Sequence, residues 1–196
     1  MTKIFIIYIL ATEVPVDSLL NFCNEQNEDG LKIDSNSIIV RATALAVNEL
    51  HISNDLTINV TQITNNNNSF VTIANLGSKG LQTISNEINR VSNNNGDNSN
   101  SNNNGTIHIY SALNGVVEIE QITEINKKDE MLTLTIGTPN KKIIVNDEEQ
   151  MKISDVTQIT VTADIRLIDE YQAALFLQRI VNIIKNPYSL LLDNNK

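Results

Sequence analysis

The sequence is poor in cysteine, histidine and aromatic residues, and each shortage excludes a class of site. Cys23 is the only cysteine, so neither an intramolecular disulfide nor a cysteine-based structural zinc site can form. There is no Trp, and four Phe and four Tyr residues leave few rings to stack on bases or sugars. The two histidines, His51 and His108, are far apart in the chain and have no ligand-type residue at helical or hairpin spacing. No metal site is therefore predicted.

Basic residues are also scarce, and this limits the partners that the protein can bind. Lys and Arg number 14 against 23 Asp and Glu, and the net charge of -9 disfavours binding to nucleic acid or to anionic membranes. No run approaches the roughly 20 apolar residues of a membrane span. The run Ile4 to Leu10 follows a single Lys and lacks a small-residue cleavage pattern, so we interpret it as a buried strand and find no convincing signal peptide. A soluble protein is expected, in the cytoplasm or within an assembled particle.

No motif for catalysis is present. The sequence contains no P-loop, Gly-x-Gly-x-x-Gly, nucleophile elbow or His-Glu-x-x-His. Cys23 lies beside Leu19 and Leu20 on the apolar face of an expected helix, where cysteine behaves as a small hydrophobe. Glu118, Glu120 and Glu124 recur along one face, which is more typical of a solvated surface than of acid catalysis. The sequence therefore predicts no catalytic residue, no cofactor-binding residue and no metal ligand, and indicates that the protein is not an enzyme.

Asparagine is the abundant residue. Of its 30 copies, eight fall in the stretch from 93 to 105, which has no apolar residue to bury. We expect a single domain over residues 1–196 with a flexible Asn-rich loop at 93–105.

The first half of the chain alternates between strand and helix patterns. Apolar spacing predicts a helix from Val16 to Cys23 that ends at Asp29-Gly30, and another from Leu81 to Val91. Alternation in 56–61 and the apolar run 70–76 predict a hairpin. The segment from Ile38 to Ile52 fits both strand and helix, and its alternating start favours a strand.

The second half is dominated by strand patterns. Apolar and polar residues alternate over 107–110, 117–125 and 132–136, and a β-branched run covers 153–162. Gly137 to Asn140 has turn chemistry and is expected to join 132–136 to 142–145 as a hairpin. The fold class predicted is α+β: a mainly antiparallel sheet, sandwich or barrel-like, with two short helices and one long C-terminal helix.

That long helix is expected at 164–186, before Pro187. Its first half has one apolar face and its second half has another on roughly the opposite side, so one sheet cannot cover both. Either the sheet wraps around the helix or the second half packs on a partner, and we favour the partner. The residues predicted for this interface are Leu177, Ile180, Val181, Ile183 and Ile184.

Three functions remain open. The first is a non-enzymatic structural or assembly subunit of a larger complex, a virion or tube-type component included, which binds copies of itself or other subunits. The second is an intracellular adaptor of a multi-protein complex, and the third is an enzyme whose site is scattered along the sequence. The composition favours the first function, because it resembles that of subunits in large assemblies. This is an association and not an argument from particular residues.

Overall fold

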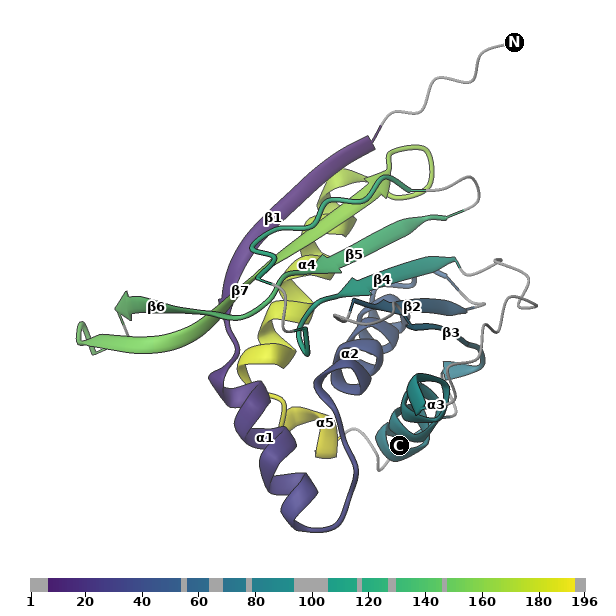
Figure 1. Cartoon of the computed structure of the whole chain (residues 1–196). Coiled ribbons are helices and arrows are strands. Elements are labelled where there is room, and N and C mark those ends of the chain that lie inside the picture. Colours follow the sequence, from purple (N-terminus) through teal and green to yellow (C-terminus); the bar gives the residue numbers. More distant parts are fainter. Residues whose placement is uncertain are drawn as a thin grey trace.

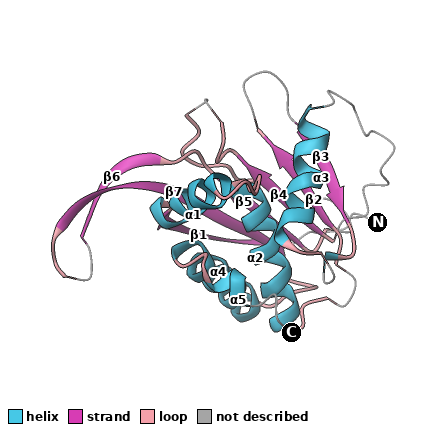
Figure 2. Cartoon of the chain, turned by 90° about the horizontal axis from the view of Figure 1, so that it is seen from below, coloured by secondary structure: helices cyan, strands magenta, loops and turns pink. Residues whose placement is uncertain are grey.

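A single mixed β-sheet with helices on one side forms the molecule (Figures 1 and 2). The computed structural model describes residues 7–53, 56–63, 69–76, 79–93, 106–115, 118–126, 130–145 and 148–192. Most of the Asn-rich stretch 93–105 lies outside these residues.

The sheet has seven strands in the order β1-β7-β5-β4-β2-β3, with β6 paired to β7. Their bounds are β1 Ile7–Pro15, β2 Ile58–Gln62, β3 Ser69–Ile73, β4 Ile107–Ser111, β5 Leu132–Ile136, β6 Asn140–Val145 and β7 Met151–Asp164. The expected hairpin of β2 and β3 is confirmed. The middle of the sheet is parallel, because β4 runs parallel to both β2 and β5.

The predicted sandwich or barrel with a mainly antiparallel sheet is therefore wrong. All the described strands belong to one sheet, and its apolar face packs on helices instead of on a second sheet. Parallel neighbours need long crossover connections, and here they are α3 between β3 and β4 and the segment between β4 and β5. Alternation within each strand carries no information about strand direction, which is why the pattern did not reveal the parallel pairs.

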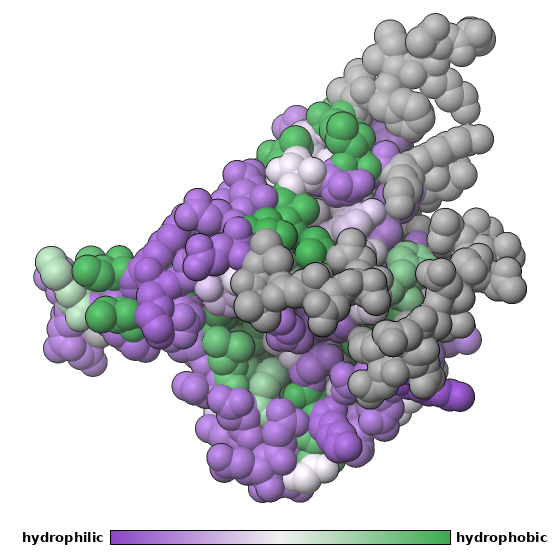
Figure 3. All heavy atoms as spheres, in the orientation of Figure 1, coloured by the Kyte–Doolittle hydropathy of each residue, from purple (hydrophilic) through white to green (hydrophobic). Residues whose placement is uncertain are grey.

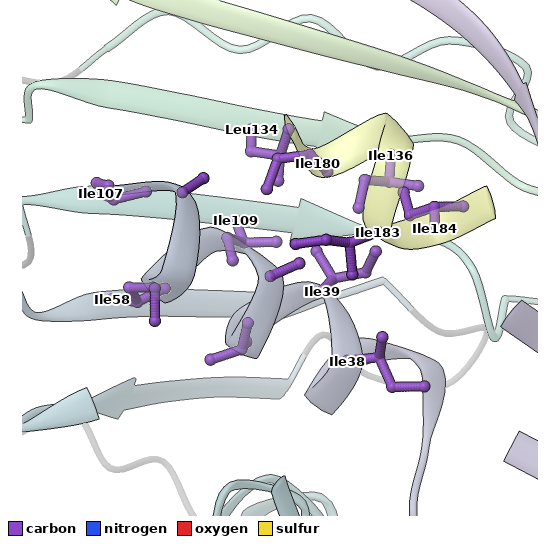
Figure 4. Close-up of a cluster of buried hydrophobic side chains, with 14 of the residues drawn as sticks. Ile38, Ile39, Ile58, Ile107, Ile109, Leu134, Ile136, Ile180, Ile183 and Ile184 are labelled. Atoms are coloured by element: carbon purple, nitrogen blue, oxygen red, sulfur yellow. The ribbon is translucent and has the colours of Figure 1, made fainter. Parts of the chain in front are cut away.

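The helices cover one face of the sheet (Figure 2). They are α1 Asp17–Glu28, α2 Ser35–Glu49, α3 Leu81–Asn93, α4 Glu170–Lys185 and α5 Ser189–Leu192. The core lies between α2, α4 and the strands, where Ile39, Ile109, Leu134 and Ile180 are fully or almost fully buried (Figure 4). The predictions of α1 and α3 are confirmed.

Helix α2 corrects the strand favoured for 38–52. Asp34 caps it by accepting a hydrogen bond from Ser37 N at 2.7 Å, a signal typical of a helix N-terminus. The alternation of Ile38, Val40 and Ala42 had suggested a strand, but the helix is buried nearly all round, so both faces are apolar.

Helix α4 begins at Glu170, later than the expected start at 164. Asp169 caps it by accepting from Gln172 N at 2.7 Å. Leu167 lies before the helix and is exposed, and so is Tyr171 in its first turn, so these two side chains cover no sheet. The second stripe packs on the core, and of the first stripe Ile168 does so as well, so one sheet is enough to cover the buried side chains.

The strands β6 and β7 form an arm that projects beyond the sheet (Figures 1 and 2). Residues 151–156 of β7 pair with β6, whereas β1 joins β7 from Val156 onward and β5 joins it from Ile159 onward. The predicted hairpin of 132–136 with 142–145 is therefore wrong, because β5 and β6 both pair with β7 and not with each other.

Candidate functional site

The face of the sheet opposite the helices is polar. Strand register aligns Asn59, His108, Thr133 and Thr162 in one row across β2, β4, β5 and β7. All four side chains are almost completely buried. Buried polar groups of this number are costly unless they are paired or functional, so this row is the first place to look for a site.

Part of this face is covered by the segment 118–126, which has no helix or strand. Thr135 Oγ1 donates to Ile122 O at 2.6 Å, and Thr138 N donates to Ile119 O at 2.8 Å. The approach is so close that a Cβ on Gly137 would lie 2.4 Å from Glu120 O. Glycine at 137 is thus required for the cover, and the predicted strand at 117–125 is an irregular segment lying on the sheet.

His108 is the centre of the row. Its Nδ1 lies 3.1 Å from Glu130 Oε1, and its Nε2 lies 2.9 Å from Thr61 Oγ1. The exposed fractions of His108 and Glu130 are 2% and 5%, whereas Thr61 is partly exposed. A partly exposed residue's hydroxyl, a buried imidazole and a buried carboxylate are therefore joined through the two ring nitrogens.

Two aromatic rings hold this imidazole in place. Tyr110 stacks on His108 with ring centroids 4.1 Å apart and planes at 15°, and Phe70 meets it edge-on at 5.8 Å. With Glu130 ionised, Nδ1 carries the proton and donates to the carboxylate, which leaves the lone pair of Nε2 to accept from Thr61. This arrangement is that of a base oriented by a carboxylate and directed at a hydroxyl.

Polar atoms without a partner lie beside this group. Among the described residues, Asn126 Oδ1, Thr133 Oγ1 and Thr162 Oγ1 are buried with no hydrogen bond. Thr133 and Thr162 face each other in the strand register, next to His108. The polar face is therefore not packed for stability alone, because each unpaired group carries a desolvation penalty.

The other residues considered from the sequence lie elsewhere. Burial raises the pKa of the Cys23 thiol to about 12, with a smaller contribution from the charge of Asp34, which fits the expectation of an inert cysteine. His51 is exposed at the end of α2 with φ of 51°. Glu118 and Glu120 lie in the covering segment, not on a strand, and no described group of His, Cys, Asp and Glu is arranged to hold a metal ion.

The residues predicted for a partner interface lie mainly in the core of this chain. Leu177, Ile180, Ile183 and Ile184 are buried, and Ile180, Ile183 and Ile184 point toward the sheet in Figure 4. Val181 packs partly buried against the same cluster. The second half of α4 thus covers its own sheet.

Comparison with protein families decides the class of the chain. Residues 5–192 match the model of the 2-oxoacid dehydrogenases acyltransferase catalytic domain. The chain belongs to this family.

Relatives and solved structures agree with this membership. A dihydrolipoyllysine-residue acetyltransferase component of the mitochondrial pyruvate dehydrogenase complex of Arabidopsis thaliana is 25% identical over 94% of this chain. The chain spans 38% of that relative's length. The structure of a probable dihydrolipoamide acetyltransferase of Listeria monocytogenes has a TM-score of 0.78 at 17% identity, covering 92% of this chain and 85% of that one.

Two further structures share the fold. One is the cubic core of the pyruvate dehydrogenase multienzyme complex, with a TM-score of 0.75 at 14% identity, covering 95% of this chain and 84% of that one. The other is the dihydrolipoamide acetyltransferase of Azotobacter vinelandii, with a TM-score of 0.74 at 15% identity and the same coverage. In that enzyme a serine, a histidine and an asparagine were investigated for their role in the catalytic mechanism, and the asparagine lies four positions after the histidine.

Family membership corrects the functional predictions. The conclusion that the protein is not an enzyme is wrong, because the family consists of acyltransferases. The purely structural subunit and the virion component are wrong for the same reason. The prediction of protein partners is consistent with one of the similar structures, which is the core of a multienzyme complex. None of the helices in the described part of the chain is long and apolar enough to cross a membrane.

Sequence reasoning missed the group around His108 because its members are distant in the chain. Glu130 is 22 positions away and Thr61 is 47 positions away. The parallel register of β2 and β4 brings Thr61 and His108 together, and that register is invisible in a single sequence. His108 is also buried, which the alternation of 107–110 does not reveal.

Proposed function

We propose that this chain is an acyltransferase domain that moves an acyl group between two thiols, one of them on a dihydrolipoyl carrier. The match of the family's catalytic-domain model to residues 5–192 carries the proposal. The Arabidopsis relative acts on a dihydrolipoyllysine residue, and the same class of acceptor is proposed here.

Such a reaction needs a base. The attacking thiol must lose its proton, and the leaving thiolate must regain one, so a group that both accepts and donates a proton lowers the barrier. Histidine is suited to both steps near neutral pH. His108 is the histidine of this chain with a buried carboxylate partner.

The sequence spacing around this histidine differs from that in the Azotobacter enzyme. There an asparagine follows the histidine by four positions. Here Asp55 follows His51 and Ala112 follows His108 at that spacing. The acid-base chemistry proposed for this chain therefore relies on Glu130 and Thr61 as the partners of its histidine.

The test is a direct assay of acyl transfer by the whole chain. Acetyl-coenzyme A as donor and dihydrolipoamide as acceptor provide the two thiols. We expect formation of acetyl-dihydrolipoamide above the rate without protein. A folded protein that gives no increase over that rate would overturn the proposal.

We also propose that the β6–β7 arm contributes to assembly with other copies of the chain. Ile143, Val145, Met151 and Ile153 are all more than 60% exposed, and the pairings of Ile143 with Ile153 and of Val145 with Met151 place them on one face. Apolar surface gathers at the tip of this arm in Figure 3. An isolated two-stranded ribbon with an apolar face is marginal in water, so a partner would stabilise it.

The occupant proposed is a second copy, because a related structure is a core built for a multienzyme complex. Changing Ile143 and Ile153 to Ser should reduce the mass measured by analytical ultracentrifugation and leave the melting temperature of the domain nearly unchanged. Ile125→Ser, at an exposed apolar side chain outside the arm, is the control. A mass that is identical in wild type and arm variant would exclude this role of the arm.

The compartment of this chain stays a prediction. The sequence favoured the cytoplasm or an assembled particle, whereas the Arabidopsis relative is mitochondrial. We propose the mitochondrion, and fractionation of the source cells with an antibody against the chain would test it.

A further inference from the structure

Two exposed apolar patches lie at opposite ends of strand β7. One is the apolar face of the β6–β7 arm, which carries Ile143, Val145, Met151 and Ile153. The other, here called the turn patch, consists of Ile165, Leu167 and Tyr171, whose exposed fractions are 42%, 52% and 72%. Apolar surface gathers at the arm tip and again near the upper end of the molecule in Figure 3. Exposed apolar surface of this kind is typical of interaction sites.

We propose that the arm of one copy docks on the turn patch of the next copy, so that copies of the chain join head to tail. The inference rests on the assembly role proposed for the arm and adds the surface that receives it. The arm lies too far from the turn patch of its own chain. Strand β7 separates the two with 14 residues, which span roughly 45 Å at about 3.3 Å per residue.

The turn patch is held in a fixed conformation. Arg166 Nε donates to Asp164 Oδ1 at 2.8 Å, and Leu167 N donates to Asp164 O at 2.9 Å. The carbonyl of Ile168 accepts a hydrogen bond from the hydroxyl of Tyr8 on β1 at 2.5 Å. The exposed side chain of Leu167 is therefore presented by an ordered turn, and a partner that binds it pays little conformational entropy for ordering the site.

The apolar face of the arm is the open one. On the other face, the Ser154 hydroxyl donates to Asp17 at the start of α1, and Lys152 Nζ lies 4.0 Å from the same carboxylate. The chain therefore covers part of that face itself. Ile143 and Ile153, on the apolar face, remain 71% and 66% exposed.

The charges beside the two patches are complementary. The paired strands of the arm carry three lysines and one aspartate. Lys141, on the apolar face, keeps 75% of its side chain exposed. The segment 164–171 carries three carboxylates and one arginine. Arg166 is paired within the turn, whereas Asp169 and Glu170 at the start of α4 are exposed. A cationic arm in a chain of net charge -9 thus matches an anionic rim on the next copy.

A head-to-tail contact covers both patches at once. If two arms paired with each other across a twofold axis, the turn patch of each copy would stay exposed. Heterologous contacts repeat from copy to copy, and they close into a ring when the rotation between copies permits it. The inference therefore predicts one closed oligomer in which every arm and every turn patch is occupied.

The experiment is analytical ultracentrifugation of the whole chain and of two variants. The arm variant carries Ile143→Ser with Ile153→Ser, and the turn variant carries Leu167→Ser with Tyr171→Ser. Each variant keeps one of the two surfaces intact. We expect each variant alone to have the monomer mass of 21.8 kDa, and their equimolar mixture to form a species of twice that mass. One arm and one turn patch remain in the mixture to bind each other, and the resulting pair cannot add a third copy.

Folding and specificity are controlled separately. All four substituted side chains are exposed, so the circular dichroism spectra of both variants should match that of the wild type. Ile125→Ser removes an exposed apolar side chain outside both patches and should keep the mass of the wild type.

The outcomes distinguish this inference from the role proposed for the arm. A turn variant that keeps the wild-type mass, beside a monomeric arm variant, would retain the role of the arm and overturn the turn patch as its docking surface. Two monomeric variants whose mixture stays monomeric would overturn the head-to-tail contact. A wild type that is itself monomeric would contradict both the inference and the role of the arm. The acyl-transfer assay tests the proposed reaction independently of all three results.

Discussion

The two faces of the sheet carry side chains of opposite character. The face toward the helices carries Ile58, Ile109 and Leu134 against α2 and α4, and it is apolar and closely packed. The opposite face carries Asn59, His108 and Thr133 and is covered in part by an irregular segment. Within each strand, alternate residues point to opposite faces of the sheet, so every strand supplies side chains to both faces.

This difference separates stability from chemistry. The apolar face contributes most of the buried hydrocarbon, which is the main favourable term in folding. The polar face buries groups that cost free energy, and it keeps a histidine paired with a carboxylate. Changes on the first face should therefore affect folding, and changes on the second should affect mainly activity.

The largest effect is expected on the apolar face. Ile180→Glu with Ile184→Glu places two carboxylates where the side chains are buried, at a cost of several kcal/mol from a typical stability of about 5–15 kcal/mol. We expect an unfolded or insoluble chain by circular dichroism. Ala174→Glu, at an exposed position of the same helix, is the control and should fold normally. A double variant that remained folded would show that this stripe of α4 is not part of the core.

A smaller effect is expected where the covering segment meets the sheet. Gly137→Ala puts a Cβ 2.4 Å from Glu120 O and 2.8 Å from Ile119 O, so the cover must shift. The expected loss is about 1–3 kcal/mol in the free energy of unfolding, measured by denaturant titration. Gly80→Ala has no atom within 4 Å of the added Cβ and should be nearly neutral. Equal stability of the two variants would mean that the segment does not lie on Gly137.

Within the polar face, paired and unpaired threonines should respond differently. Thr135→Val removes a hydroxyl that donates to Ile122 O, and should cost about 0.5–1.5 kcal/mol. Thr133→Val removes a buried hydroxyl that has no partner among the described residues, and should be neutral or stabilising. Thermal melts of both variants measure the difference. A loss of stability in Thr133→Val as large as that in Thr135→Val would show that the Thr133 hydroxyl has a hydrogen-bond partner.

The smallest effect concerns Cys23. Its pKa is raised to about 12, so the thiol stays protonated at pH 8 and its thiolate forms only as the pH approaches that value. We expect iodoacetamide to label Cys23 very slowly in the native protein and at an ordinary rate in urea, as followed by mass spectrometry. Fast labelling of the native protein at pH 8 would contradict the buried position.

Sequence patterns predicted local elements better than their arrangement. The strands at 107–110 and 132–136 were located by alternation alone, and the helix from Val16 by its apolar spacing. The parallel pairing of β4 with β2 and β5 was missed, because direction and order depend on crossovers and not on periodicity.

The site was missed for the same reason. His108 was visible as one of two histidines, but its neighbours come from distant segments, among them Phe70 of β3 and Glu130. Glu130 lies just before a predicted strand, and nothing in the sequence indicates that it pairs with His108. The enzymatic class was missed as well, because none of the catalytic motifs sought in the sequence is present.

The most direct test of the chemistry proposed for the polar face compares its histidine, His108, with the exposed His51. His108→Gln and His51→Asn are measured side by side for acyl transfer from acetyl-coenzyme A to dihydrolipoamide and for thermal stability. Asparagine suits the positive φ of 51° at position 51. His108→Gln combined with Glu130→Gln serves as a second variant, which leaves no unpaired buried charge. We predict a fall in rate of at least about 100-fold for both variants at position 108, with folding retained in the paired variant, and a normal rate for His51→Asn. Full activity in a folded protein that lacks the His108 imidazole would contradict the account.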